Sequence, residues 1–285
     1  MAEGGKIKMR VAIVGPGAVG KFLSMKLVRA DGVDVVRIGK EDSPEKISAE
    51  LDFVFIAVKQ PDFSAAIRKL YPLIGSNALI IPLQNGIEHY EILEGRFGKN
   101  AVAGTIGGLE VYKSGKKLVW KRSGNEHINL ASRDNTARRR LSRELQPILN
   151  STGIKTNVGD DPKKILWEKL VRMCAIGGVC AASGLPIGKV LQDNEWRNSL
   201  VKALKAATEI AKVDGTFVSV SDALSAILAL SPKFEPSLLK DLKRKKPNEL
   251  DAILGAVVRR GEKLGVCAGP IAELILKIKK KYKLK

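Results

Sequence analysis

Residues 10–20 read RVAIVGPGAVG, an apolar run of strand length that passes directly into the pattern Gly-x-Gly-x-x-Gly. Helical spacing follows over residues 19–29. A glycine pattern between a strand and a helix is typical of the turn that holds the pyrophosphate of a dinucleotide. We expect Gly15 to permit a tight turn, Gly17 to let the backbone approach a phosphate, and Gly20 to bring helix and strand close together. The predicted cofactor-binding turn comprises Gly15, Pro16, Gly17, Ala18, Val19 and Gly20.

The first half of the chain alternates short apolar runs with helical patterns. Continuous apolar runs suit strands that are buried on both faces of a parallel sheet. Alternation of such strands with helices predicts a doubly wound α/β sheet of the Rossmann type. The predicted strands are 10–14, 33–38, 53–58, 78–82, 101–106, 127–131 and 154–158, with a hairpin over 109–121; the predicted helices are 19–29, 63–71, 87–97 and 137–149.

Strand patterns cease after the turn Gly159-Asp160-Asp161-Pro162. A chain of 285 residues is long enough for two domains of about 100–200 residues each. We therefore predict a dinucleotide-binding Rossmann domain over residues 1–159 and an all-helical, substrate-binding domain over residues 160–285. Helices are predicted in the second domain at 163–182, 196–213, 220–230, 236–243, 249–264 and 270–282.

The composition indicates a globular protein with a strongly basic surface. Hydrophobic residues make up 45% of the chain, which is enough to build a core and excludes intrinsic disorder. The net charge of +19 would attract anionic ligands. Aromatic residues make up only 5%, so the stacking surfaces of a single-strand binder are missing, and nucleic-acid binding is disfavoured.

The cysteines and histidines indicate neither a disulfide framework nor a metal site. Cys174, Cys180 and Cys267 form no C-x-x-C pair, and His89 and His127 are far apart in the sequence. We expect the cysteines to be small core residues in a reducing compartment. Residues 1–9 lack the apolar segment of a signal peptide, and no run suits a membrane span, so we predict a cytoplasmic protein.

The residues after the second predicted strand bear on the choice between two nicotinamide cofactors. An NAD enzyme usually places an acidic residue there, on the ribose 2′-hydroxyl. This chain has Lys40, and a cation suits the 2′-phosphate of NADP(H). Glu41 and Asp42 follow immediately and leave NAD open, and Lys40 could also be a solvated loop residue. The charge argument favours NADP(H).

Lys169 lies in the middle of an apolar stripe on the predicted helix 163–182. Residues on the same side of the helical wheel are Ile165, Met173, Ile176 and Cys180. Such a lysine either extends past its neighbours to solvent or loses water, which lowers its pKa towards a range useful for proton transfer. A carbonyl reduced by hydride needs a proton at its oxygen, and Lys169 could supply it.

Several motifs together resemble the ketopantoate reductase family. They are the glycine turn, Lys59 after the third predicted strand, Asn85-Gly86, the run Leu166-Trp167-Glu168-Lys169-Leu170, and Glu249-Leu250-Asp251 ahead of Arg259-Arg260 and Gly265-Val266. The resemblance spans nearly the whole chain. It implies NADP(H)-dependent reduction of ketopantoate to pantoate, a 2-keto acid reduction in pantothenate and coenzyme A biosynthesis. Family members are often dimers, so the resemblance leaves a homodimer open.

The resemblance also implies roles for individual residues. Lys169 is similar to the family's catalytic lysine, and Glu249 to the carboxylate that positions substrate and lysine. Asn85 matches an asparagine near nicotinamide and substrate, Lys59 a cofactor-contacting lysine, and Ser237 a serine that binds the substrate carboxylate. Local structural roles remain open for the other residues. Asn85 and Lys59 could belong to a turn or a helix cap. Ser237 and Glu249 could each lie at a helix start, and Asn248 would then cap the helix that begins near Glu249.

Three positions depart from the family pattern. Met173, Gly177 and Leu254 stand where asparagines commonly hold the hydroxylated keto acid, which implies a changed or more apolar substrate. The segment between Ile38 and Phe53 is also shorter than is usual in the family. Two alternatives therefore stay open: a related dehydrogenase that acts on another keto acid or on an imine, and an NADP-binding sensor without turnover.

Overall fold

The computed structural model describes residues 8–42, 50–71, 74–114, 117–121 and 125–284. The chain divides into two compact units. The first comprises Met1–Gln84 and His89–Ile165, and the second comprises Asn85–Glu88 and Leu166–Lys285. The short segment Asn85–Glu88 thus belongs with the helical half of the chain, although it follows a strand of the first unit.

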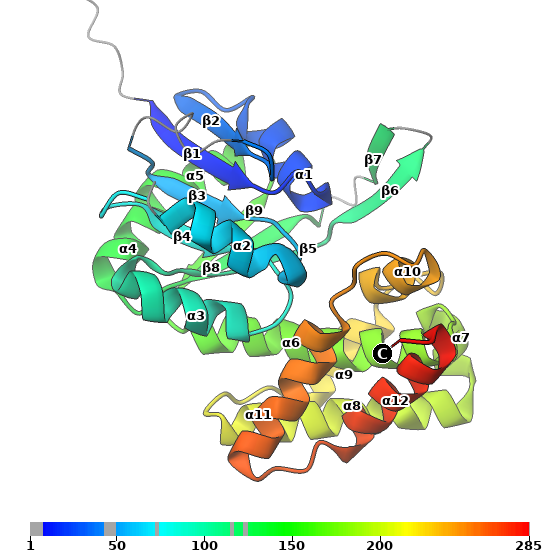
Figure 1. The fold of residues 1–285 in the computed structure, drawn as a ribbon. Helices are drawn as coiled ribbons and strands as arrows, with labels where there is room; N and C mark the ends of the chain where they lie inside the picture. Colours follow the sequence, from blue (N-terminus) through cyan, green and yellow to red (C-terminus); the bar gives the residue numbers. More distant parts are fainter. Residues whose placement is uncertain (1–7, 43–49, 72–73, 115–116, 122–124, 285) are drawn as a thin grey trace, which may run out of the picture. The chain divides into compact units, whose positions relative to one another are not determined.

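Four parallel strands form the sheet that positions the glycine turn (Figure 1). Their order is β2-β1-β3-β4, so the chain starts in the middle, adds β2 on one side, and continues with β3 and β4 on the other. The carboxyl ends of β1 and β3 therefore form the switch point where doubly wound sheets bind ligands. The strands are β1 (Met9–Val14), β2 (Val33–Ile38), β3 (Phe53–Ile56) and β4 (Leu79–Pro82).

A second, mixed set of strands continues from β4. The Val102 N–H donates to the Ile80 carbonyl at 3.0 Å, which links β4 to the segment before β5 (Ala103–Gly107). β5 is antiparallel to β8 (His127–Ala131), and β8 is parallel to β9 (Lys155–Gly159). The apolar run of β5 identified a buried strand but not the direction of its partner. The predicted hairpin is present as β6 (Glu110–Ser114) and β7 (Lys117–Lys121).

Helices cover the sheet of the first unit, with α2 and α3 in front of it and α5 behind it in Figure 1. Their apolar sides form one core with the strands, in which Phe53, Phe55 and Leu23 are completely buried. The predicted helix 137–149 is continuous but contains a π-helical turn, η4 (Leu141–Leu145). The helices are α1 (Ala18–Leu27), α2 (Gln60–Leu70), α3 (Glu88–Phe97), α4 (Asn135–Arg140) and α5 (Gln146–Ser151), with a 3-10 turn, η3 (Gly98–Asn100).

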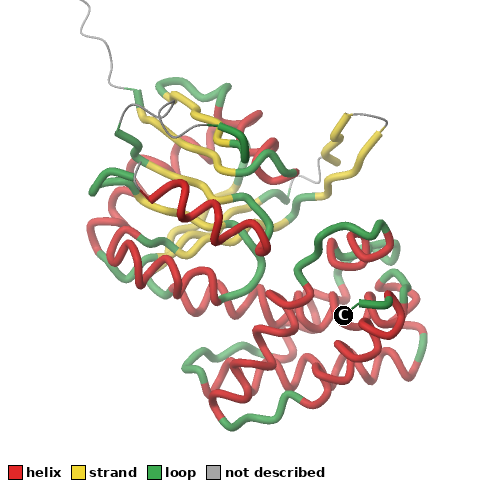
Figure 2. The backbone as a smooth tube through the Cα atoms, viewed as in Figure 1, coloured by secondary structure: helices red, strands yellow, loops and turns green. Residues whose placement is uncertain are grey.

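The second unit is helical in all its described elements (Figure 2). Its central helix is α8 (Asn194–Val213), which packs against α7, α9, α11 and α12. The helix α7 (Ile187–Gln192) was not predicted, because six residues are too few to set a helical period. The others are α6 (Pro162–Ser183), α9 (Val220–Leu228), α10 (Ser237–Lys243), the π-helical turn η5 (Asp251–Gly255), α11 (Ala256–Leu264) and α12 (Gly269–Tyr282).

The predicted boundary after Gly159 falls just before α6, whose first residues still belong to the first unit. The division of roles between the two predicted domains stays a prediction. Within the described ranges, no helix is both long and apolar enough to cross a membrane.

Candidate functional site

The glycine turn lies at the switch point of the sheet, between β1 and α1. Gly15 has a φ of +108°, which side chains rarely tolerate, and a Cβ there would lie 2.9 Å from the Ala57 carbonyl carbon. A Cβ on Gly20 would lie 2.0 Å from the Gly15 carbonyl oxygen. These two glycines are therefore required by the turn itself and by the close approach of α1 to β1.

Gly17 differs from the other two glycines in this turn. It is the N-cap residue of α1, it is exposed, and its φ of −70° is open to any residue. The atom nearest to an added Cβ is the Ala57 carbonyl oxygen, at 3.7 Å, so packing within the described chain does not require glycine here. A ligand that lies against this backbone would require it. The first turn of α1 contains no acidic residue, which also suits an anion. The turn fits a dinucleotide.

The loop after β2 keeps Lys40 available to a ligand. The Asp42 carboxylate accepts from the Gly39 N–H at 2.7 Å, so this acid is engaged with the backbone of its own loop. Lys40 and Glu41 are both exposed. The backbone carbonyl of Lys40 accepts from the Lys69 ammonium at 2.9 Å. Half of the short segment between Ile38 and Phe53, residues 43–49, lies outside the described residues.

Lys59 follows β3 on the same edge of the sheet as the glycine turn. It is the N-cap residue of α2 and is partly exposed, and its carbonyl accepts from the Asp62 N–H at 3.0 Å. Lys59 therefore forms part of the helix start through its backbone, as the alternative reading allows. The contact of its side chain with a cofactor stays a prediction.

Lys169 lies on α6 and is partly shielded from water. Burial lowers the pKa of its ammonium from 10.5 to about 8; the charge of Glu249 opposes this shift, and that of Arg172 adds to it. Ile176 and Cys180, on the same side of the helix, are fully buried, whereas Ile165 and Met173 are partly exposed. Lys169 thus combines a position on an apolar stripe with an ammonium that can release its proton near neutral pH.

Two further predicted site residues meet directly in the second unit. The side-chain amide of Asn85 donates to Glu249 Oε2 at 2.9 Å, across 164 positions in the sequence. Both residues are partly exposed. Gly86, with a φ of +108°, lies so close to the π-helical turn η5 that an added Cβ would be 2.7 Å from the Ala252 carbonyl oxygen. The charge of Glu249 also acts on Lys169, so Asn85, Glu249 and Lys169 form one cluster, which holds an amide, a carboxylate and an ammonium.

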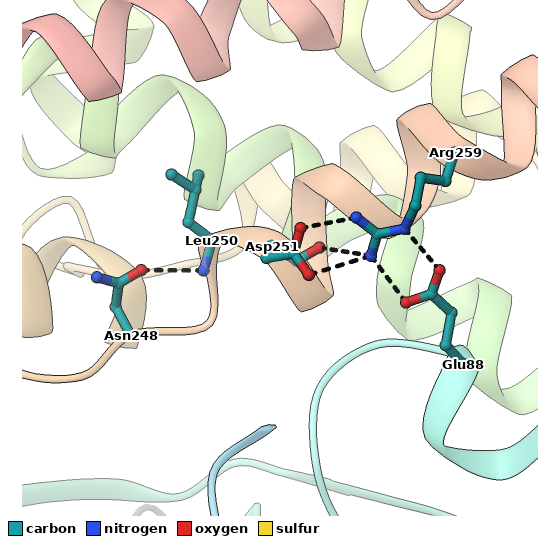
Figure 3. Close-up of polar contacts among 5 residues, drawn as sticks. All are labelled: Glu88, Asn248, Leu250, Asp251 and Arg259. Carbon is teal, nitrogen blue, oxygen red and sulfur yellow. Dashed lines mark hydrogen bonds and ion pairs between the residues drawn. The ribbon is translucent and has the colours of Figure 1, made fainter. Parts of the chain in front are cut away.

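The remaining predictions around this cluster concern helix starts. Ser237 is exposed at the first position of α10, and Pro236 rather than Ser237 is the N-cap residue. Asn248 does cap the next helix: its side-chain oxygen accepts from the Leu250 N–H at 3.1 Å (Figure 3). Glu249 therefore lies at a helix start capped by Asn248, as the structural alternative predicted, and its role at the substrate stays a prediction.

The structure also contains two charged networks that the sequence analysis did not assign. Arg259 forms ion pairs with Glu88 and Asp251 at the surface of the second unit (Figure 3). Deeper in that unit, Asp214 accepts from the Trp167 indole at 2.9 Å and from Arg260 at 3.1 Å. The run Arg259-Arg260 was visible as a motif, but its partners lie on segments distant in sequence.

The three positions that depart from the family pattern differ in their surroundings. Leu254 is fully buried, with its side chain next to Gly178, so it belongs to the helical core rather than to an open site. The inference from Leu254 to a more apolar substrate is therefore not supported by its position. Gly177 is buried opposite Leu238, and Met173 is partly exposed one turn from Lys169.

The cysteines are free thiols in two different environments. Cys174 and Cys180 are buried, which raises the pKa of each thiol to about 12 and keeps them unreactive. Cys267 is exposed, so the expectation that all three are core residues is wrong for this one. Among the described residues, no group of three or more His, Cys, Asp or Glu side chains is placed to hold a metal ion.

Two family models match the chain, and both describe the same family. Residues 39–135 match the model for ketopantoate reductase PanE/ApbA, and residues 161–282 match its C-terminal model. Among curated relatives, a 2-dehydropantoate 2-reductase from Aquifex aeolicus is 26% identical over 97% of both chains. Another from Archaeoglobus fulgidus is 24% identical over 91% of this chain and 93% of its own length.

Solved structures share the fold over almost the whole chain. The 2-dehydropantoate 2-reductase from Geobacter metallireducens has a TM-score of 0.83 at 23% identity, and the match covers 96% of this chain and 100% of that one. D-mandelate dehydrogenase in complex with NADH and anilino(oxo)acetate has a TM-score of 0.85 at 17% identity, covering 96% and 98%. A dimeric ketopantoate reductase from Staphylococcus aureus has a TM-score of 0.80 at 21% identity, covering 96% and 99%.

Proposed function

The chain belongs to the ketopantoate reductase family, a family of oxidoreductases, and from this premise we propose that it reduces ketopantoate to pantoate with NADPH. The reaction converts the ketone of a 2-keto acid to an alcohol and consumes one hydride and one proton. The proposed physiological role is a step in pantothenate and coenzyme A biosynthesis.

The observation that carries this proposal is the cluster of Lys169, Glu249 and Asn85. A lysine whose pKa is lowered to about 8 holds a proton at neutral pH and can give it up to a developing alkoxide. Glu249 keeps the ammonium charged by opposing the effect of burial. Asn85 holds the Glu249 carboxylate through a hydrogen bond to Oε2 and so fixes its orientation.

Each residue has a distinct role in the proposed reaction. Lys169 Nζ donates a proton to the ketone oxygen, and Glu249 and Asn85 orient the substrate. Ser237, exposed at the start of α10, binds the substrate carboxylate. The bound nicotinamide cofactor supplies the hydride. Lys40 pairs with its 2′-phosphate, Lys59 contacts the cofactor, and the first turn of α1 holds its pyrophosphate.

The proposal is tested by mixing the purified protein with NADPH and ketopantoate and following the absorbance of the reduced nicotinamide. We expect turnover in the wild-type protein and a loss of at least about a hundredfold in Lys169→Ala. NADPH binding, measured by fluorescence, should be unchanged in that variant. Lys205→Ala, which removes an exposed lysine from α8, is the matched control and should keep full activity.

A second candidate is a related dehydrogenase that acts on another 2-keto acid or on an imine. Met173 and Gly177 favour it, because neither can hydrogen-bond a substrate hydroxyl. The likeness of fold to D-mandelate dehydrogenase suggests aromatic 2-keto acids as the first alternatives to assay. A higher kcat/KM for phenylglyoxylate than for ketopantoate would select this candidate. NADPH binding without turnover of any keto acid or imine would indicate a sensor.

A homodimer is proposed on the same family ground, because a structural relative from Staphylococcus aureus is dimeric. Light scattering coupled to size-exclusion chromatography tests it: a dimer of this chain has about twice the monomer mass of 30.9 kDa.

A further inference from the structure

The guanidinium of Arg259 donates two hydrogen bonds to each of two carboxylates, those of Glu88 and Asp251 (Figure 3). Its Nε and Nη2 donate to the two oxygens of Glu88 at 2.9 and 2.8 Å. Its Nη1 and Nη2 donate to the two oxygens of Asp251 at 2.7 and 3.2 Å. We call these three residues the Arg259 clamp. Paired contacts of this kind fix geometry in a way that a lysine cannot.

The clamp connects the two segments that carry predicted site residues. Glu88 lies three positions after Asn85, and Asp251 lies two positions after Glu249. The same segments also meet through the Asn85–Glu249 hydrogen bond and through the close approach of Gly86 to the Ala252 carbonyl. The clamp is therefore a second link between the two segments that carry Asn85 and Glu249.

The backbone next to the clamp is shaped to make room for it. A Cβ on Gly255 would lie 2.6 Å from Asp251 Oδ1 and 3.1 Å from Arg259 Nη1. Gly255 ends the π-helical turn η5 and has an ordinary helical φ of −59°, so its conformation does not require glycine. A methyl group at this position would displace the Asp251 carboxylate or the Arg259 guanidinium, so glycine leaves room for the ion pair. An ordinary surface pair would contribute little and would need no such room.

From this arrangement we infer that Arg259 is a positioning residue, which sets Glu249 against Asn85 and thereby the field that Glu249 exerts on Lys169. The inference rests on the proposed function, because it assigns Arg259 to the same reaction. The charged groups that act on Lys169 are Glu249, which favours its protonated form, and Arg172, which disfavours it. Displacing Glu249 should therefore lower the pH at which Lys169 loses its proton.

The decisive variant is Gly255→Ala, because it disturbs the clamp without changing the net charge. It should also preserve the fold, since alanine is the better helix former. We expect kcat/KM to fall by about tenfold to a hundredfold, as for a small displacement of catalytic groups. We also expect the alkaline limb of the kcat/KM profile to move to lower pH by about half a unit. Arg259→Gln and Glu88→Gln should each also lower kcat/KM and move the alkaline limb to lower pH.

Two matched controls separate positioning from general effects. Gly95→Ala adds a methyl group to α3, where an added Cβ meets open space. It should change neither kcat/KM nor the position of the alkaline limb of the pH profile. Arg133→Gln removes an exposed arginine that pairs with Glu94 at 3.1 Å, and it should behave like the wild type.

The outcomes distinguish this inference from the proposed function. If the wild-type protein turns over no keto acid, the proposed function fails and the inference fails with it. If the wild-type protein is active but the alkaline limb stays in place in Gly255→Ala and in Glu88→Gln, the inference alone is overturned. A uniform loss at every pH, with a lower melting temperature, would assign the clamp a purely structural role and would also overturn it.

Discussion

The side-chain amide of Asn85 donates to the Glu249 carboxylate at 2.9 Å, although the two residues are 164 positions apart in the sequence. The hydrogen bond joins the segment after β4 to the residues just before the π-helical turn η5. The contact thus selects a neutral donor at position 85, because a second carboxylate there would face the first.

Replacing the donor by an acid is the sharpest test of this contact. In Asn85→Asp, two carboxylates would meet at hydrogen-bond distance, and they cannot both be ionised without repulsion. We expect kcat/KM to fall at pH 7 by about a hundredfold and to recover partly at lower pH, where the pair shares a proton. Asn85→Ala should lose activity without this recovery. Equal pH profiles for the two variants would contradict the arrangement.

The pH dependence of turnover follows from the lowered pKa of Lys169. The ammonium is the proton donor, so the active form exists below its pKa of about 8 and disappears above it. We expect log kcat/KM to be level near pH 7 and to fall with a slope of −1 above about pH 8. The measurement is a profile from pH 6 to pH 10 at saturating NADPH. A profile that stays level to pH 10 would show that another group supplies the proton.

The exposed position of Lys40 predicts how the cofactor preference responds to mutation. Lys40→Ala should raise the Kd for NADPH by about tenfold to a hundredfold, the size of a charge-assisted hydrogen bond, and should leave the Kd for NADH nearly unchanged. Lys99→Ala removes the same charge from another exposed site in the first unit and serves as the control. If Lys40→Ala raises the Kd for NADPH and the Kd for NADH equally, Lys40 contributes only to the general positive field of the protein.

The strands and most helices could be predicted from sequence because their signals are local. The run at residues 53–56 is apolar at every position, and β3 is buried at every position. Lys169 could likewise be identified, because the stripe around it lies within one helix. Local patterns fail for α7, which is too short, and for the π-helical turn η5, which has no sequence period of its own.

The contacts between distant segments could not be predicted from the residues alone. Glu88 and Arg259 are 171 positions apart, and no pattern in either segment indicates the other. Family resemblance named Asn85 and Glu249 as site residues but did not say that they touch. For Leu254 the resemblance itself was misleading. It placed this residue at the substrate, whereas the fold buries it in the helical core.

A final prediction concerns stability and rests on the buried ion pair between Arg260 and Asp214. Their side chains are only 9% and 5% exposed, and Asp214 also accepts from the Trp167 indole. Asp214→Ala would leave the Arg260 charge buried without this partner, so we expect the free energy of unfolding to fall by about 3–5 kcal/mol. Glu195→Ala, which breaks an exposed pair with Lys277, should change it by no more than about 1 kcal/mol.

The double variant Asp214→Leu/Arg260→Met separates the cost of burying the Arg260 charge without Asp214 from the contribution of the ion pair itself. Replacing both charged groups by apolar side chains removes the burial penalty together with the attraction, so most of the lost stability should return. Urea unfolding followed by tryptophan fluorescence measures all three variants, because Trp167 lies beside the pair. If the double variant is as unstable as Asp214→Ala, the indole hydrogen bond and the local packing, rather than the loss of the ion pair, determine the stability of this helical unit.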